Sequence, residues 1–205
     1  LSYSIYGEKN PASDVLTPSE LKKIKQEELT ELIKSLPSYS HRILYYGNKD
    51  RKSLTSLLKK YHNIPLKFLE VENKIKNYQE KDYKKNYVFW TNFDMVQTEI
   101  ILLSRLEPLD NEKTAAINLF NQYFGGGMNS IVFQEIREAR GLAYAVFSNY
   151  SQASKTDRSD YLLSYVGVQS DKQSEALSSM FELINELPES ERAFEIAKKA
   201  IAKKT

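Results

Sequence analysis

An arginine and a tyrosine are the residues of this sequence whose types and spacing are best suited to chemistry. Arg137 and Tyr144 lie seven residues apart in the stretch "YFGGGMNSIVFQEIREARGLAYAV", which covers residues 123–146. A guanidinium carries only hydrogen-bond donors, and a phenol can donate as well. Two such groups that converge on one point could stabilise an oxygen atom that gains negative charge during a reaction.

The local pattern places both groups near one turn of the chain. We expect a helix over residues 129–140, a left-handed C-terminal cap at Gly141 and a strand that follows at once. This reversal would bring Tyr144 back beside the last helical turn, which holds Arg137. A purely structural alternative remains open. In that case Arg137 pairs with Glu135 or Glu138 on the helix surface, and Tyr144 packs in the core.

Three consecutive glycines, Gly125, Gly126 and Gly127, precede this helix and have three interpretations. A phosphate cradle is disfavoured, because the glycines follow a helix and lack both the GxGxxG spacing and a Lys-Ser/Thr ending. A tight turn between helices would use the freedom of glycine at positive φ, although such a turn needs only one or two of them. The third interpretation is a backbone kept bare so that another chain can pass close to it.

Metal and thiol chemistry have few candidates in this chain. Cysteine is absent, so there is neither a disulfide framework nor a thiolate nucleophile, and the redox compartment stays open. The histidines are His41 and His62, whose spacing is poor for a metal site, and no loop has the acidic pattern of an EF-hand. We therefore expect both histidines to be structural or solvent-facing and the chain to hold no zinc.

The length and the net charge of the chain limit the number of domains and the classes of function that remain. With 205 residues the chain suits one large single-core domain or two small ones. A formal net charge of +2 with interspersed signs argues against nucleic acid as an obligate partner. No apolar run is long enough to span a bilayer, and none resembles a signal peptide. Both ends look cut from something longer.

The order of predicted elements indicates an α+β fold, a mostly antiparallel sheet with helices on one face. Thr17, Pro18 and Glu20 form a capping box for the first strong helix. Residues 63–86 are interpreted as a polar excursion between two halves of one sheet and not as a domain boundary, with a linker as the alternative. The predicted helices cover residues 17–36, 50–62, 110–124, 129–140, 171–187 and 189 onward, and the predicted strands cover 41–47, 87–91, 98–106, 142–153 and 159–169.

The stretch "GGGMNSIVFQEIREARGLAYAV" resembles the pitrilysin/insulinase family of zinc metallopeptidases, in which a glycine-rich turn precedes a helix-to-strand element of this kind. The segments "ELIKSLPSYSHRILYYGNKDRKSLTSLLKKYH" and "MVQTEIILLSR" extend the similarity over roughly residues 16–199. The resemblance implies a domain like those of the mitochondrial processing peptidase. It also implies a division at residues 1–15, the flank of a preceding domain, and 16–205, one C-terminal-type domain truncated at its end.

The family's inverted zinc motif is absent here, so the resemblance is to the half of the enzyme that carries no zinc. In that half an arginine and a tyrosine seven residues apart complete the active site, and Arg137 and Tyr144 match them in type and spacing. They would hydrogen-bond the scissile carbonyl and the oxyanion formed when zinc-bound water attacks. The implied partners are a zinc-bearing half, in the same chain or in another subunit, and a peptide substrate.

Some relatives use a longer glycine-rich loop to handle substrate, and Gly125, Gly126 and Gly127 form a short version of it. A non-catalytic structural or binding subunit of the same family is the alternative function. In that case the chain would hold a partner, and Arg137 would be an ordinary surface ion pair. The lack of cysteine favours a bacterial periplasm over the cytoplasm.

Overall fold

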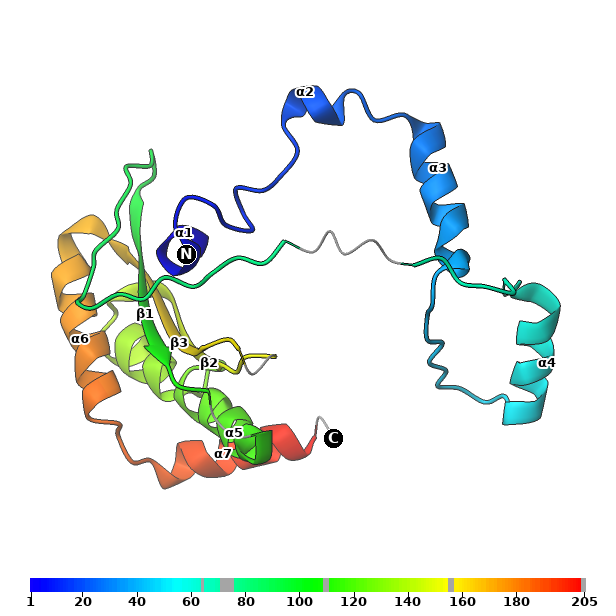
Figure 1. Ribbon diagram of the computed structural model, residues 1–205. Helices are drawn as coiled ribbons and strands as arrows, with labels where there is room; N and C mark the ends of the chain where they lie inside the picture. The colour runs from blue at the N-terminus through cyan, green and yellow to red at the C-terminus, as the bar shows by residue number, and fades with distance from the viewer. Residues whose placement is uncertain (64, 71–75, 109–110, 155–156, 204–205) are drawn as a thin grey trace. The chain divides into compact units, whose positions relative to one another are not determined.

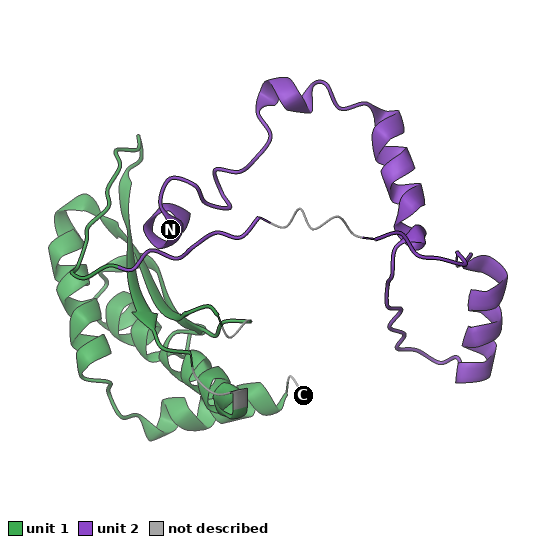
Figure 2. Ribbon diagram, in the orientation of Figure 1, with its two compact units in different colours: residues 1, 83–205 green, residues 2–82 purple. Residues whose placement is uncertain are grey.

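The computed structural model describes residues 1–63, 65–70, 76–108, 111–154 and 157–203. The chain divides into two compact units, which Figure 2 shows in different colours. The N-terminal unit comprises residues 2–82, and the C-terminal unit comprises residues 83–205 together with Leu1. In the part of the chain described, no helix combines the length and the apolar character needed to cross a membrane.

The N-terminal unit is made of helices whose caps follow the sequence pattern. Thr17 accepts a hydrogen bond from the backbone N–H of Glu20, whose carboxylate accepts one from the backbone N–H of Thr17, so the predicted capping box is confirmed. Asp50 caps the fourth helix by accepting from Ser53 N–H at 2.7 Å. The helices are α1 (Ser2–Tyr6), α2 (Pro18–Leu21), α3 (Gln26–Ser35), the 3-10 turn η1 (Leu36–Ser38) and α4 (Arg51–Tyr61).

Two predictions for this unit are wrong. The single helix expected over residues 17–36 is divided, because Lys25 has extended backbone and starts a second helix, α3. The strand expected over residues 41–47 has no ladder partner among the described residues, and Leu44 is 87% exposed. A strand without a pairing neighbour leaves its backbone groups to water, so an apolar run alone does not form one.

The C-terminal unit contains a three-stranded antiparallel sheet in the order β1-β3-β2. Its strands are β1 (Gln97–Leu106), β2 (Ala143–Ser151) and β3 (Asp160–Gln169). Ile100 pairs with Val166 in β3, which pairs in turn with Val146 on β2. The predicted hairpin of β2 and β3 is thus confirmed, whereas residues 87–91 form no strand and expose Trp90.

Helices cover one face of this sheet (Figure 1). The hydrophobic core lies between the sheet and these helices, with Val132, Ile136 and Met180 fully buried against the inward side chains of β2 and β3. This arrangement is the predicted α+β fold. Its helices are η2 (Asn111–Lys113), α5 (Thr114–Phe124), the π-helix η3 (Phe133–Ala139), the 3-10 turn η4 (Ser170–Lys172), α6 (Gln173–Asn185) and α7 (Glu191–Ala202).

Polar side chains tie the layers together. The Asn121 side chain on α5 donates to the Tyr150 carbonyl at 2.8 Å and accepts from the Tyr150 N–H at 2.6 Å, so α5 is fixed to β2. Arg140, just after η3, donates to Ser179 at 2.7 Å and to Glu182 at 3.0 Å on α6. These contacts hold the turn that follows η3 in a defined place.

Candidate functional site

Gly141 produces the chain reversal predicted from the sequence. Its φ angle of +60° is the left-handed value that glycine adopts without steric cost. The N–H of the next residue, Leu142, donates to the Ile136 carbonyl at 3.0 Å, and the Leu142 side chain is buried in the core. The C-terminal cap at Gly141 is therefore confirmed, and β2 starts two residues later.

Arg137 lies on a helix that is wider than expected. Residues Phe133–Ala139 form a π-helix, and the Arg140 N–H donates to the Glu135 carbonyl, five residues back, at 3.2 Å. Such turns are rare and occur frequently at functional sites. The periodicity of the sequence predicts a helix here, but it does not distinguish a π-helix from an α-helix.

Tyr144 lies at an irregularity in β2. Ala143 faces Val168 and Ala145 faces Gly167 on β3, so Tyr144 is an extra residue in the ladder. A bulge of this kind re-aims a side chain. The side chain of Tyr144 is 73% exposed. The structural alternative in which Tyr144 packs in the core is therefore wrong.

The guanidinium of Arg137 has two neighbours from its own helix. Its Cζ atom lies 4.7 Å from the centroid of the Phe133 ring, and its Nε atom lies 3.8 Å from a carboxylate oxygen of Glu138. The second separation is an ion pair beyond hydrogen-bond length. The Arg137 side chain is 42% exposed, and within the described residues it donates no hydrogen bond. Its donors thus remain available to a ligand.

The glycine run has a structural explanation at its first position. Gly125 is buried, and a Cβ atom there would lie 2.1 Å from the Ser148 carbonyl oxygen of β2. The strand that passes close to the bare backbone therefore belongs to this chain. Gly126 and Gly127 are exposed, and Gly127 has a φ of +143°. The structure thus separates Gly125 from the two glycines that a ligand could reach.

The half-buried Tyr150 and the buried Asp160 form a titratable pair at the far end of β2 from Tyr144. The Tyr150 hydroxyl donates to Asp160 at 2.9 Å, and Asp160 also accepts from the Ala153 N–H at 2.8 Å. Burial, and then the hydrogen bond to Asp160, raise the pKa of Tyr150 to about 12. A phenol held neutral in this way locks the end of the hairpin and has no acid–base role near neutral pH.

The described residues do not fit a zinc site. Among them, no group of three or more His, Cys, Asp and Glu side chains could hold a metal ion. His41 and His62 contact each other, with their Nε2 atoms 2.7 Å apart, and His41 Nδ1 lies 2.6 Å from the Tyr39 carbonyl oxygen. The two Nε2 atoms are engaged with each other, and two side chains fall short of the three protein ligands of a catalytic zinc ion.

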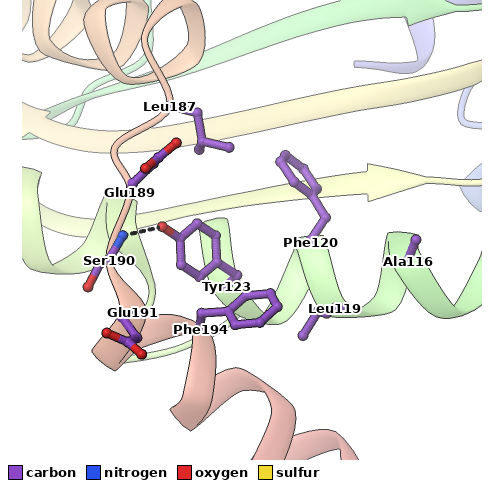
Figure 3. A pocket seen from close by; sticks show the side chains of 9 residues that line it. All are labelled: Ala116, Leu119, Phe120, Tyr123, Leu187, Glu189, Ser190, Glu191 and Phe194. Atoms are coloured by element: carbon purple, nitrogen blue, oxygen red, sulfur yellow. Dashed lines mark hydrogen bonds between the residues drawn. The ribbon is translucent and has the colours of Figure 1, made fainter.

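An open apolar groove of about 510 Å³ lies between α5 and α7 (Figure 3). Tyr123 on its wall donates to the Pro188 carbonyl at 2.5 Å and accepts from the Ser190 N–H at 2.9 Å. The groove contains Phe120 and Phe194, and Glu189 and Glu191 also line it. Its lining is mostly apolar, and neither Arg137 nor Tyr144 belongs to it, so the groove is separate from the candidate site.

Comparison with solved structures supports the fold. A peptidase M16 inactive domain from Pseudomonas fluorescens matches with a TM-score of 0.69 and 20% identity, over 100% of this chain and 49% of that one. A protease from Helicobacter pylori matches with a TM-score of 0.63 and 16% identity, over 99% of this chain and 51% of that one. The chain therefore spans about half the length of each of these proteins.

Shorter stretches match curated sequences. An uncharacterised zinc protease of Mycobacterium leprae is 44% identical over 55 residues, which are 27% of this chain and 12% of that protein. An uncharacterised zinc protease of Rickettsia felis is 48% identical over 58 residues, 28% of this chain and 14% of the relative. These matches cover only a small part of each relative.

The model of one protein family covers most of the chain. It describes the peptidase M16 inactive domain and matches residues 23–201, across both units. This agrees with the resemblance carried by the glycine turn and the helix-to-strand element, and it fits a zinc site that lies outside this chain. The chain belongs to the M16, or pitrilysin/insulinase, family of zinc proteases and represents its inactive C-terminal domain.

Proposed function

We propose that this chain contributes Arg137 and Tyr144 to the active site of a metalloendopeptidase whose zinc ligands lie in another half or in a partner subunit. Membership of the inactive-domain family supports a site in which the zinc ligands lie outside this chain. The observation that carries the proposal is the pair of local distortions on either side of Gly141. Arg137 lies on a π-helix and Tyr144 at a strand bulge, and both side chains are exposed.

The two groups act by donating hydrogen bonds. The Arg137 guanidinium and the Tyr144 hydroxyl donate to the scissile carbonyl oxygen of a bound peptide, and these bonds strengthen as that oxygen gains negative charge. Neither side chain makes a hydrogen bond within the described residues that would have to break first.

The peptide substrate is an unfolded segment. Gly126 and Gly127 are the glycines of the loop that contact it, because Gly125 is closed off by the backbone of Ser148. The zinc-bearing half supplies the attacking water, and this chain binds and orients the carbonyl. Alone, the 205-residue chain cleaves nothing.

The test is Arg137→Ala in the assembled peptidase, with turnover measured on a fluorogenic unfolded peptide. Loss of one oxyanion donor lowers kcat about 100-fold or more. Tyr144→Phe, which removes only the hydroxyl, also lowers kcat. The matched control is Arg192→Ala: Arg192 is exposed on α7, a different element from those that carry Arg137 and Tyr144, so its loss should leave turnover unchanged.

Unchanged turnover in Arg137→Ala would remove the catalytic assignment. That outcome would favour the second function, a non-catalytic subunit that holds a partner. A pull-down of the zinc-bearing half by this chain, with peptidase activity unaffected by both Arg137 and Tyr144 variants, would establish that role.

A further inference from the structure

The guanidinium of Arg137 lies over the aromatic ring of Phe133, a residue that has no role in the proposed function. Phe133 precedes it by four residues on η3, and the guanidinium carbon lies 4.7 Å from the ring centroid. A cation within about 6 Å of an aromatic centroid is attracted by the ring quadrupole. The contact is therefore an attraction between the two side chains as well as a packing contact.

The ring is held more firmly than the guanidinium. Phe133 is half-buried and packs against the hydrophobic core, between the fully buried neighbours Val132 and Ile136 on the same helix. Arg137 has a long side chain with several rotatable bonds, and its exposed end would otherwise sample many rotamers. Contact with a ring that is packed against the core reduces the number of rotamers that the Arg137 side chain samples.

The two neighbours of Arg137 would affect its donors differently. A carboxylate such as that of Glu138 takes up N–H groups when it pairs closely with arginine. An aromatic ring attracts the face of the guanidinium and leaves the N–H groups, which lie in its plane, free to bind a ligand. Glu138 lies at 3.8 Å, beyond hydrogen-bond length, so its carboxylate takes up none of the Arg137 donors.

We propose that Phe133 is a positioning residue for Arg137. It fixes the guanidinium at the site without consuming its donors, so that the carbonyl oxygen of a peptide meets a preorganised group. This inference rests on the proposed function and adds to it the residue that holds Arg137 in place. Positioning matters because a donor displaced by about 1 Å can lose most of its effect on rate.

Two substitutions of Phe133 distinguish the effect of its aromatic face from the effect of its packing in the core. Phe133→Leu keeps an apolar side chain in the core but removes the aromatic face, and Phe133→Tyr keeps the face. In the assembled peptidase we expect Phe133→Leu to lower kcat about three- to tenfold with KM nearly constant, and Phe133→Tyr to retain kcat. Thermal unfolding of each variant identifies any loss that comes from stability alone.

A double-mutant cycle with Arg137→Ala gives the decisive readout. If Phe133 acts through Arg137, adding Phe133→Leu to Arg137→Ala lowers kcat no further. An equal factor in both backgrounds would show that Phe133 only supports the fold, and an unchanged kcat in Phe133→Leu alone would also overturn the proposal.

The contact is also measurable without activity. In the chain itself, the NMR signal of the Arg137 Nε–H should show a ring-current shift that is lost in Phe133→Leu and kept in Phe133→Tyr. If this shift is present but Arg137→Ala leaves turnover unchanged, the proposed function fails and the contact is structural. If the shift is absent, the positioning role fails, whatever Arg137 does.

Discussion

A Cβ atom on Gly125 would lie 2.1 Å from the carbonyl oxygen and 2.3 Å from the amide nitrogen of Ser148. Both are backbone atoms of the central part of β2, so neither can rotate away. The end of α5 therefore touches the strand at a point where only hydrogen fits. Because β2 also carries Tyr144, this contact helps to fix the strand on which one candidate residue lies.

Gly125→Ala should destabilise the C-terminal unit more than any other substitution in the glycine run. The added methyl group has to displace backbone, which costs about 1–3 kcal/mol or more of unfolding free energy. The measurement is urea unfolding followed by circular dichroism. Gly141→Ala is the comparison: nothing lies within 4 Å of its Cβ position, and its cost of about 1 kcal/mol comes from φ alone. Equal losses in the two variants would contradict the close-approach explanation.

Tyr123→Phe should weaken the attachment of α7. The hydroxyl both donates to Pro188 and accepts from Ser190, and its removal leaves two backbone groups without that partner. We expect a loss of about 1–3 kcal/mol, since the two half-buried groups lose their hydrogen bonds. Tyr144→Phe is the matched control, because that side chain is exposed and should leave the midpoint of thermal unfolding unchanged. A stable Tyr123→Phe variant would argue against this link.

The stability of the chain should fall at high pH in a way that depends on Tyr150. Its pKa is raised to about 12 by burial and by Asp160, whereas an unfolded tyrosine titrates near 10. Between these values the unfolded state has released a proton that the folded state keeps, so stability is fully present below pH 10 and is lost as pH rises toward 12. Urea unfolding at pH 9 and pH 11 should show a smaller decline in Tyr150→Phe than in the wild type. Equal declines would exclude Tyr150 as the source.

Zinc should not stabilise the isolated chain. The described residues hold no group of three or more metal-binding side chains, and mass action raises the unfolding midpoint only when a ligand binds the folded state. Differential scanning fluorimetry with equimolar zinc and with a chelator should give the same midpoint. In the assembled peptidase, the chelator should abolish turnover. A zinc-dependent midpoint that disappears in His41→Gln would reveal a site at the histidine pair.

The sequence determined the parts of this structure that local chemistry controls. Thr17 and Glu20 specify a helix start, and Gly141 specifies a helix end. The Tyr, Leu and Val residues of β3 specify a strand that pairs with β2 across a polar turn. The spacing of Arg137 and Tyr144 on either side of Gly141 can also be recognised in the sequence, and with it the family. Side-chain caps and hydrophobic periods act within a few residues, so they do not need the rest of the fold.

Only the tertiary structure decided which of the remaining patterns are realised. The run at 41–47 has the composition of a strand, yet no segment that the structure describes pairs with it. The bulge at Tyr144 appears only in the pairing of β2 with β3, and the close approach of Gly125 to Ser148 appears only where α5 meets β2. The π-helix that carries Arg137 is likewise visible only in the structure. These features depend on distances between segments far apart in the chain. A sequence pattern cannot express such distances, because it records neighbours along the backbone and not across it.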